Sequence, residues 1–224
     1  MMRHDRVEER RAPVSLAPPR VDPPLPADAR DKLDAYLDLL AKWNRVYNLT
    51  AIRDRRQMES HHVSDALAVL PFLPDAPGLT LLDVGSGGGI PGIPLAIARP
   101  EWRIVLLDAN RKKVAFLTQA AIELGLANVR AVASRIEDFA AGERFDVVIS
   151  RAYSDLRTFA EATAPHVSDD GMIVAMKGAL PRDEIDALPK GILVTATPAL
   201  DVPGLDARRH LVVMRAVRGQ AVER

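Results

Sequence analysis

The sequence predicts an α/β fold built around a mostly parallel sheet, and three observations support this prediction. Short apolar runs alternate with helical stretches from Thr80 onward. Two of the runs, residues 145–150 and 172–176, are almost continuously apolar, which is typical of strands covered on both faces of a parallel sheet. A glycine-rich segment follows the first run, where a strand of such a sheet turns into a helix. At 224 residues, the chain has room for one domain of this kind and a small appendage.

The N-terminal part is expected to contain two helices that follow a leader. Residues 1–26 contain six prolines and no apolar period, so we expect a disordered leader there. Apolar residues recur at helical spacing over residues 33–43, which predicts a helix that starts near Asp28. A second helical stretch covers about residues 55–70 and should end before Pro71.

These two helices form an expected appendage over residues 27–75, and the main domain covers residues 76–220. The expected strands are 80–84, 103–107, 129–133, 145–150, 171–177, 191–197 and 209–217, and the expected helices are 92–99, 111–124, 154–165 and 181–187. Only a turn near Pro203 separates the last two strands. They should therefore pair antiparallel, because a parallel crossover needs about a dozen residues. A seven-stranded, mostly parallel sheet with a C-terminal antiparallel hairpin is the layout of the Rossmann-like class I methyltransferases.

Composition excludes several classes of protein. The 30 basic and 30 acidic residues cancel, which argues against a large, uniformly basic nucleic-acid-binding face but permits a local one. Cysteine is absent, so the chain has no disulfides, no cysteine-ligated zinc and no thiol catalysis. No apolar run reaches the roughly 18 residues of a membrane span, and the N-terminus lacks the apolar segment of a signal peptide. We therefore expect a cytoplasmic protein without membrane contact.

The segment from Thr80 to Gly92 contains the clearest functional signal. It reads as a strand followed by Gly85-Ser-Gly87-Gly-Gly89, and Asp108 ends the next strand. Glycine lets the backbone approach a ligand, and a helix N-terminus offers free N–H groups. An acid at the tip of the neighbouring strand can accept hydrogen bonds from ribose hydroxyls. The sequence therefore predicts a pocket for a nucleoside-containing cofactor.

The spacing of the glycines favours one class of cofactor. The dinucleotide pattern Gly-x-Gly-x-x-Gly would place its third glycine at position 90, where the chain has Ile90. S-adenosylmethionine has no pyrophosphate, and it needs room for an amino-acid tail and a sulfonium. The spacing Gly85-x-Gly87-x-Gly89 followed by Asp108 fits that donor better than a nicotinamide dinucleotide. A structural turn without a ligand is the remaining alternative.

The absence of certain residues narrows the methyl acceptor. Attack through C5 of a pyrimidine needs a cysteine nucleophile, which this chain lacks. Exocyclic amines are commonly handled by an Asn/Asp-Pro-Pro-aromatic loop, and the matching position here reads Ile149-Ser-Arg-Ala-Tyr153. A ring nitrogen such as guanine N7 has a free lone pair, so alignment alone can serve it. We therefore expect no catalytic acid–base residue and no metal.

A set of short motifs resembles the RsmG (GidB) family. The motifs are Asn48-Leu-Thr50, His62-Val-Ser-Asp65, the glycine-rich segment from Leu82 to Pro94, Ser134-Arg-Ile-Glu137, Ile149-Ser-Arg-Ala152, Met176-Lys-Gly178 and Arg209-His-Leu-Val-Val213. The resemblance runs from about Leu33 to Arg215, and it departs at His61, where the family often has arginine. It implies methylation of guanine N7 in 16S ribosomal RNA, at the nucleotide conventionally numbered 527. The partner would be this RNA or the small ribosomal subunit, and we expect a monomer.

The resemblance also implies roles for individual residues. Gly85 and Ile90 would border the cofactor, Ile136 and Glu137 would flank its adenine, and Asp108 would hold its ribose. Ile90 could equally be plain core.

Several charged residues are candidates for further contacts. Arg151 ends the fourth strand, where it could bind a carboxylate or phosphate of the cofactor or form an ion pair within the protein. Candidates for RNA contact are His62, Asp65, Arg111, Lys177 and Arg209. His62 and Asp65 are three residues apart, so on a helix they share a face, which also suits a plain packing pair. Lys177 could instead pair with an acid.

Two other functions stay open at this point. A methyltransferase of the same fold could act on a small molecule or a protein. The chain could also be a non-catalytic module that binds RNA or a nucleotide.

Overall fold

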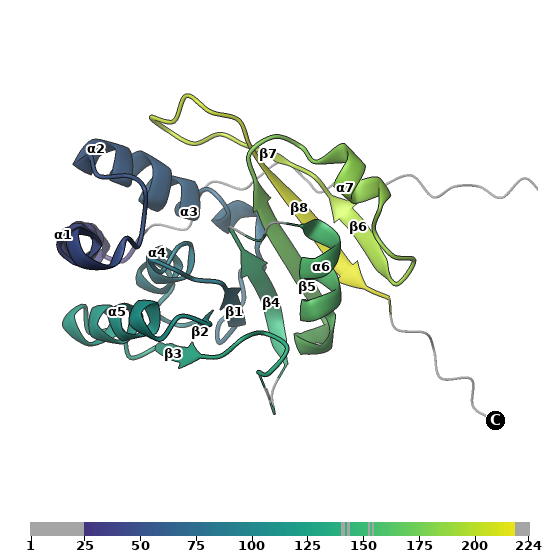
Figure 1. Cartoon of the computed structure of the whole chain (residues 1–224), viewed down its shortest axis with the longest axis horizontal. Helices are drawn as coiled ribbons and strands as arrows, with labels where there is room; N and C mark the ends of the chain where they lie inside the picture. Colours follow the sequence, from purple (N-terminus) through teal and green to yellow (C-terminus); the bar gives the residue numbers. More distant parts are fainter. Residues whose placement is uncertain (1–24, 140–141, 143, 152, 154, 218–224) are drawn as a thin grey trace, which may run out of the picture.

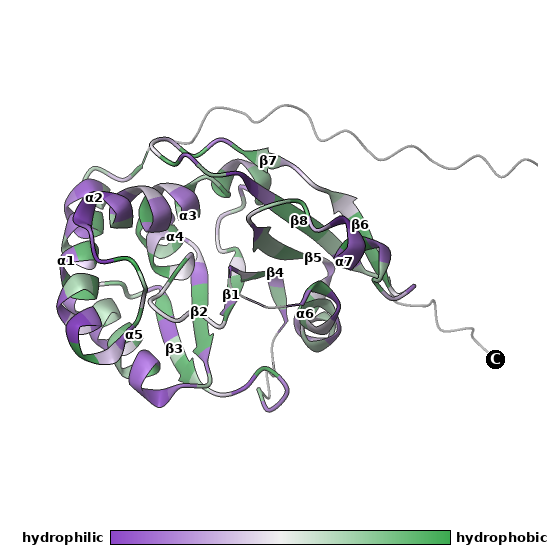
Figure 2. Ribbon diagram, turned by 45° about the horizontal axis from the view of Figure 1, so that its top comes forward, coloured by the Kyte–Doolittle hydropathy of each residue, from purple (hydrophilic) through white to green (hydrophobic). Residues whose placement is uncertain are grey.

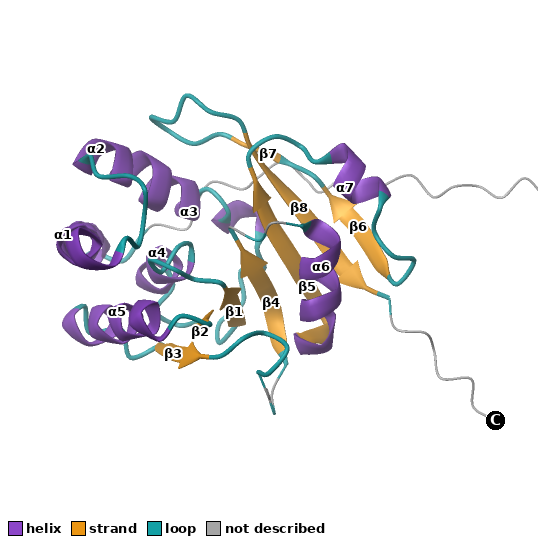
Figure 3. Ribbon diagram, viewed as in Figure 1, coloured by secondary structure: helices purple, strands orange, loops and turns teal. Residues whose placement is uncertain are grey.

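A twisted sheet with helices on both faces forms the centre of the molecule (Figures 1 and 3). The computed structural model describes residues 25–139, 142, 144–151, 153 and 155–217. Residues 1–24 of the expected leader, residues 218–220 of the expected domain and Ala152 of the Ile-Ser-Arg-Ala motif lie outside them.

The sheet has eight strands, which are β1 (Thr80–Val84), β2 (Arg103–Asp108), β3 (Val129–Ala133), β4 (Phe145–Ser150), β5 (Val167–Lys177), β6 (Ile192–Ala196), β7 (Ala199–Leu200) and β8 (Arg209–Ala216). Their order is β3-β2-β1-β4-β5-β8-β6, and the short β7 pairs with β8. Strands β1 to β5 are parallel, whereas β8 is antiparallel to β5, β6 and β7. The mostly parallel sheet and the final antiparallel pairing are therefore confirmed.

Two strand predictions need correction. Strand β5 begins at Val167 rather than at residue 171, because its first residues include the exposed polar pair Asp169-Asp170, which hides the strand pattern. The last two long strands are joined by β7 and a loop rather than by a simple turn, so the described sheet has one strand more than expected. The antiparallel pairing itself is direct, with Ile192 opposite Ala216.

The helices are α1 (Ala29–Tyr47), α2 (Arg55–Met58), α3 (Asp65–Leu67), α4 (Gly92–Ala98), α5 (Arg111–Glu123), α6 (Leu156–Thr163) and α7 (Arg182–Asp186). A π-helix, η1 (Glu59–Ser64), connects α2 to α3, and the 3-10 turns are η2 (Leu70–Phe72) and η3 (Ala164–His166). The helical stretch predicted over about residues 55–70 is therefore present over residues 55–67, but its middle is a π-helix and it ends three residues earlier than expected. Pro71 does not follow that helix but lies within η2, near its start, where a missing N–H is tolerated.

Two layers of apolar side chains hold the helices on the sheet. Alternate residues of a strand point to opposite faces, so Leu81 packs toward α1, α4 and α5, whereas Leu82 packs toward α6. In Figure 2 the sheet is largely apolar, and the outer surfaces of α1 and α2 are polar. The N-terminal helices share the first layer with the sheet, since Leu37 and Leu40 of α1 belong to the same buried cluster.

Helix α1 is fixed to the main domain by its aromatic residues as well as its leucines. The ring of Trp43 meets Phe116 of α5 edge-on at 5.6 Å between centroids. Tyr36 is fully buried, and its hydroxyl donates to the carbonyl of Gly88 at 2.7 Å. Full burial of a Leu side chain contributes about 1.5–3 kcal/mol, so a few such contacts suffice to set α1 against the glycine-rich loop.

Candidate functional site

The parallel strands bring their carboxyl ends to one edge of the sheet, where ligands bind in open α/β folds. The glycine-rich loop follows β1 at this edge, Asp108 ends β2, and Arg151 and Lys177 lie at the ends of β4 and β5. Most of the residues expected to contact a cofactor or RNA therefore lie along the same edge.

The glycine-rich loop has a conformation that side chains rarely adopt. Gly85, Gly87 and Gly89 have positive φ angles of 73°, 57° and 85°. A Cβ at Gly89 would overlap Ile93, so this glycine allows helix α4 to pack closely. A Cβ at Gly85 would meet nothing within 4 Å, although the neighbouring residues are buried. The open side of Gly85 is therefore the surface that a bound methyl donor could approach.

Asp108 joins the end of β2 to this loop. It is 7% exposed, and its Oδ2 accepts a hydrogen bond from the N–H of Gly87 at 2.9 Å. Its Oδ1 accepts from the N–H of Asn110 at 2.8 Å. Each carboxylate oxygen has a second lone pair, so the side chain can support the loop and still accept hydrogen bonds from a ribose.

Asp83 is a buried acid that the sequence argument used only as part of the loop pattern. Its Oδ2 accepts from the N–H of Gly92 at 3.0 Å, whereas its Oδ1 is buried without a partner among the described residues. Burial raises the pKa of Asp83 from 3.8 to about 7. A buried carboxylate with an unpartnered oxygen suits a cation, and the ammonium and sulfonium groups of S-adenosylmethionine are cations. In the sequence, the position of Asp83 two residues before Gly85 was the signal that could have identified it as a site residue.

The expected adenine-binding residues lie after β3. Ile136 is buried against Phe139, whereas Glu137 is exposed. Burial and then the charge of Glu137 raise the pKa of Tyr153, so these two residues lie near each other. Tyr153 was not among the expected site residues. Ile90 is 5% exposed within the main core cluster, which agrees with the alternative that it is plain core.

A pocket of about 490 Å³ lies next to the loop, and we call it the arginine pocket. It is lined by Leu49, Thr50, Ala51, Ile52, His61, His62, Asp65, Arg151, Met176, Lys177, Gly178 and Arg209. It adjoins the glycine-rich loop, because the carbonyl of Leu49 is 3.7 Å from where a Cβ of Gly88 would lie. Four of the five RNA candidates line this pocket together with Arg151. The fifth, Arg111, is exposed at the start of α5 and does not line it.

Asp65 lies at the base of this pocket between two arginines. Its side chain is 2% exposed, Oδ1 lies 3.1 Å from Arg209 Nε, and Oδ2 lies 3.6 Å from Arg151 Nη1. Burial raises the pKa of Asp65, while Arg209 and then Arg151 lower it. One carboxylate facing two guanidinium groups leaves one positive charge unbalanced, which suits an anionic group such as a phosphate.

The π-helix η1 and the first residue of α3 present His62 and Asp65 to this pocket. The N–H of Asp65 bonds to the carbonyl of Ser60, five residues earlier, which is the π-helical pattern. Single π-turns occur frequently at functional sites. His62 is 1% exposed, and burial and then the charge of Arg151 lower its pKa from 6.5 to about 4. The expected shared direction of His62 and Asp65 is therefore present on a different type of helix.

Ion pairs engage Lys177 and Arg151 as well as Arg209. Lys177 Nζ lies 2.8 Å from Glu184 Oε2, so the alternative of pairing with an acid is confirmed. Arg151 likewise pairs with Asp65. Nη1 of Arg151 also donates to the carbonyl of His61 at 2.8 Å and lies 3.3 Å from Nδ1 of His62.

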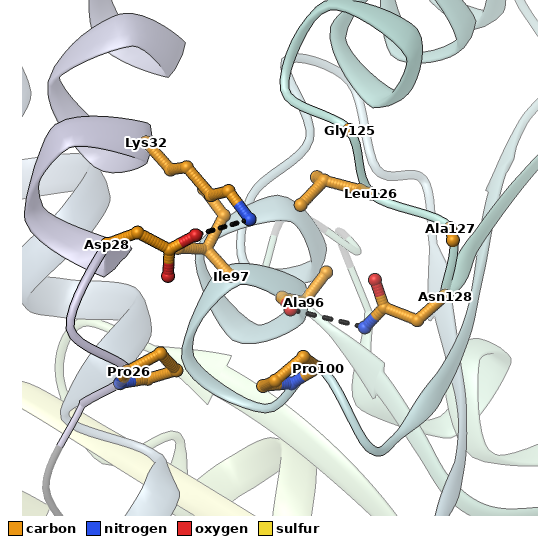
Figure 4. Close-up of a pocket in the computed structure, with 10 residues that line it drawn as sticks. All are labelled: Pro26, Asp28, Lys32, Ala96, Ile97, Pro100, Gly125, Leu126, Ala127 and Asn128. Carbon is orange, nitrogen blue, oxygen red and sulfur yellow. Dashed lines mark hydrogen bonds and ion pairs between the residues drawn. The ribbon is translucent and has the colours of Figure 1, made fainter.

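Another hollow, of about 140 Å³, lies at the opposite edge of the sheet (Figure 4). Lys32 pairs with Asp28 at its rim at 2.9 Å, and the Asn128 amide donates to the carbonyl of Ala96 at 3.2 Å. Asn128 immediately precedes β3, so this hollow lies at the amino ends of the strands, away from the glycine-rich loop.

The described residues contain no group of three or more His, Asp or Glu side chains that could hold a metal ion. Within the same residues, no helix has the length and apolar character needed to cross a membrane.

Comparisons with known proteins indicate the family of the chain. The family GidB, described as rRNA small subunit methyltransferase G, matches residues 29–212. A ribosomal RNA small subunit methyltransferase G of Neisseria gonorrhoeae is 50% identical over 94% of this chain and 98% of its own length. The protein of the same name from Chromobacterium violaceum is 52% identical over 81% of this chain and 86% of its own length.

Solved structures extend the comparison to the fold. A SAM dependent methyltransferase from Aquifex aeolicus aligns with a TM-score of 0.56 and 18% identity, over 78% of this chain and 97% of that chain. TrmN from Thermus thermophilus aligns with a TM-score of 0.53 and 18% identity, over 67% of this chain and 48% of that chain. At this level of identity the likeness concerns the fold, and it confirms the Rossmann-like methyltransferase architecture.

Proposed function

Because the chain belongs to the GidB family of rRNA small subunit methyltransferases G, we propose that it transfers a methyl group from S-adenosylmethionine to N7 of a guanine in 16S ribosomal RNA. One observation supports this most strongly. The open side of Gly85 at the tip of β1 and the positively charged arginine pocket lie at the same edge of the sheet, joined by the Leu49 carbonyl beside Gly88. The proposed site for the methyl donor and the proposed site for an anionic polymer would therefore be adjacent.

The residues at the first site fit the proposed cofactor. Asp108 would accept from the ribose hydroxyls, Gly85 would admit the donor, and Asp83 would face its cationic part. Ile136 and Glu137 would border the adenine, and Gly87 and Gly89 would hold the loop in shape. When bound, S-adenosylmethionine supplies a methyl group on a sulfonium, and the protein supplies alignment and a dry site.

Two side chains of the arginine pocket that could act as general bases are engaged by its arginines, which suits a ring nitrogen with its own lone pair. The carboxylate of Asp65 is engaged by Arg209 and Arg151, and Nδ1 of His62 faces Arg151 at 3.3 Å. Alignment of N7 with the sulfonium can account for methyl transfer without proton removal.

The proposed partner is 16S ribosomal RNA or the small ribosomal subunit. The unbalanced charge of the arginine pocket could take a phosphate of this RNA, and Arg111 and Lys112 are exposed at the start of α5, next to the end of β2. The target guanine would have to lie in a loop or leave its stack to reach the donor. A cytoplasmic monomer is consistent with this role.

A labelling experiment tests the proposal. Small ribosomal subunits from a strain that lacks this gene are incubated with the protein and methyl-labelled S-adenosylmethionine, and the modified nucleotide is mapped by mass spectrometry. We expect label at N7 of one guanine in 16S ribosomal RNA. Label found only in an extract depleted of RNA would favour a small-molecule or protein acceptor. Absence of any binding of S-adenosylhomocysteine by calorimetry would favour a non-catalytic module.

A further inference from the structure

A chain of hydrogen bonds crosses the arginine pocket with a fixed direction. A guanidinium group only donates, and Nη1 of Arg151 lies 3.3 Å from Nδ1 of His62. Nδ1 must therefore present its lone pair, and the neutral ring carries its hydrogen on Nε2. Nε2 lies 2.9 Å from Oγ1 of Thr50, so the histidine donates to the threonine hydroxyl. The depressed pKa of His62 agrees with a neutral ring at pH 7.

The hydroxyl of Thr50 is left as a pure donor. Its oxygen has two lone pairs, and it accepts from Nε2 of His62 and from the N–H of Ile52 at 3.1 Å. No hydrogen bond from this oxygen to an acceptor among the described residues is present. Thr50 lines the pocket and is half-buried, so its hydrogen is available to a ligand there.

The backbone next to Thr50 approaches the glycine-rich loop. Thr50 follows Leu49, whose carbonyl approaches Gly88 of this loop. A purine that turns its N7 toward the methyl donor places its C6 substituent next to N7. In guanine that substituent is the acceptor O6, whereas in adenine it is the donor N6 amino group.

We propose that Thr50 is the specificity-determining residue of this site and that its hydroxyl donates to O6 of the target guanine, in a direction imposed by Arg151 through His62. This proposal rests on the proposed function. Guanine completes the hydrogen-bond chain. Adenine presents an amino group to a hydroxyl that can only donate, so neither hydrogen finds an acceptor.

The test uses purine analogues at the target position of small subunits reconstituted with ligated 16S ribosomal RNA. Inosine keeps O6, whereas 2,6-diaminopurine carries an amino group at C6. We expect the wild-type protein to methylate inosine nearly as well as guanine. It should methylate 2,6-diaminopurine about 10- to 100-fold more slowly in kcat/KM, as estimated for one base-specific hydrogen-bond contact.

The matching variant is Thr50→Val, which removes the hydroxyl and keeps the shape. It should reduce kcat/KM for guanine and bring the guanine to 2,6-diaminopurine ratio close to one, while Thr50→Ser retains the ratio. Thr195→Val is a matched control, because that hydroxyl donates to the carbonyl of Val213 in β8, outside the residues that line the pocket. Thermal melting and calorimetry with S-adenosylhomocysteine show whether each variant remains folded and binds the cofactor product.

Two failures can be told apart. If the wild-type protein methylates neither guanine nor inosine at that position, the proposed function fails and this inference fails with it. If the wild-type protein methylates guanine but folded Thr50→Val keeps the full discrimination against 2,6-diaminopurine, the inference alone is overturned. If folded Thr50→Val loses the discrimination while Thr50→Ser keeps it, the inference is supported.

Discussion

The glycine-rich loop and the arginine pocket lie side by side but are built in different ways. The loop is held mainly by backbone groups, such as the N–H groups of Gly85 and Ser86, which both donate to the carbonyl of Leu107. The pocket is held by side chains from distant parts of the chain, and Asp65 and Arg209 are 144 residues apart. A loop of the first kind follows from local sequence, whereas a pocket of the second kind exists only after the whole sheet has formed.

The largest expected effect comes from breaking the pocket at Asp65. Asp65→Ala would leave two largely buried guanidinium groups without their carboxylate, and we expect a loss of about 3–5 kcal/mol in the free energy of unfolding. Urea denaturation measures this loss. Asp34→Ala is the matched control, because Asp34 also pairs with two arginines, Arg30 and Arg55, but at the surface. Surface pairs contribute little, so an equal loss in both variants would contradict the distinction between buried and exposed pairs.

The next-largest effect is expected from a substitution at Gly89 in the glycine-rich loop. Gly89→Ala would place a Cβ against Ile93 at a φ of 85°, and the combined strain and overpacking should cost about 2–5 kcal/mol. Calorimetry with S-adenosylhomocysteine should also show weakened binding. Gly125→Ala is the control, since its φ is 62° and its Cβ would meet nothing within 4 Å. If both variants bind equally well, the tight packing at Gly89 does not shape the donor site.

The buried acid beneath the loop should make stability depend on pH. The pKa of Asp83 is about 7 in the folded chain, against an ordinary value of 3.8 for the unfolded chain. Between these two pKa values the folded protein keeps the Asp83 carboxyl protonated, whereas the unfolded chain does not. The stability that this protonation contributes is lost as the pH rises through 7. Between pH 5.5 and pH 8 this should lower the free energy of unfolding by about 2 kcal/mol. Asp83→Asn should flatten that part of the pH profile, and an unchanged profile would argue against the raised pKa.

The smallest effect is expected from His62 in the arginine pocket. Here the free energy of unfolding should fall as the pH falls, which is the opposite of the pH dependence expected for Asp83. The pKa of His62 is about 4 in the folded chain, against an ordinary value of 6.5 for the unfolded chain. Its neutral form therefore contributes stability that is present above pH 6.5 and is lost as the pH falls toward 4. Between pH 7 and pH 5.5 the loss should be about 1 kcal/mol. His62→Gln should remove this acid-side loss in urea denaturation, and persistence of the loss would point to another group.

The comparison also explains what the sequence could predict. Strand ends, the glycine-rich loop and Asp108 were found because each depends on neighbouring residues or on a simple strand order. The same local reasoning placed His62 and Asp65 on one face, although the helix there is a π-helix. It could not show that Asp65 would meet Arg209, because that contact requires β8 to insert between β5 and β6.

Ambiguity remained where one residue type suits two environments. Lys177 could meet RNA or an acid, and its pairing with Glu184 depends on how α7 packs beside β5. Ile90 follows the loop directly, yet its side chain turns into the core. In both cases the sequence gives the chemical type of the side chain, whereas the direction of the side chain depends on tertiary packing.

The place of β8 in the sheet has a consequence for biosynthesis. This strand is synthesised after all the others, yet it fills the gap between β5 and β6 and brings Arg209 to Asp65. While residue 209 is still inside the ribosome, the segments of the glycine-rich loop have already been synthesised. Asp65, however, still lacks Arg209, one of its two arginine partners. Competence to engage the acceptor should therefore arise only after residue 209 has left the ribosome and β8 has entered the sheet.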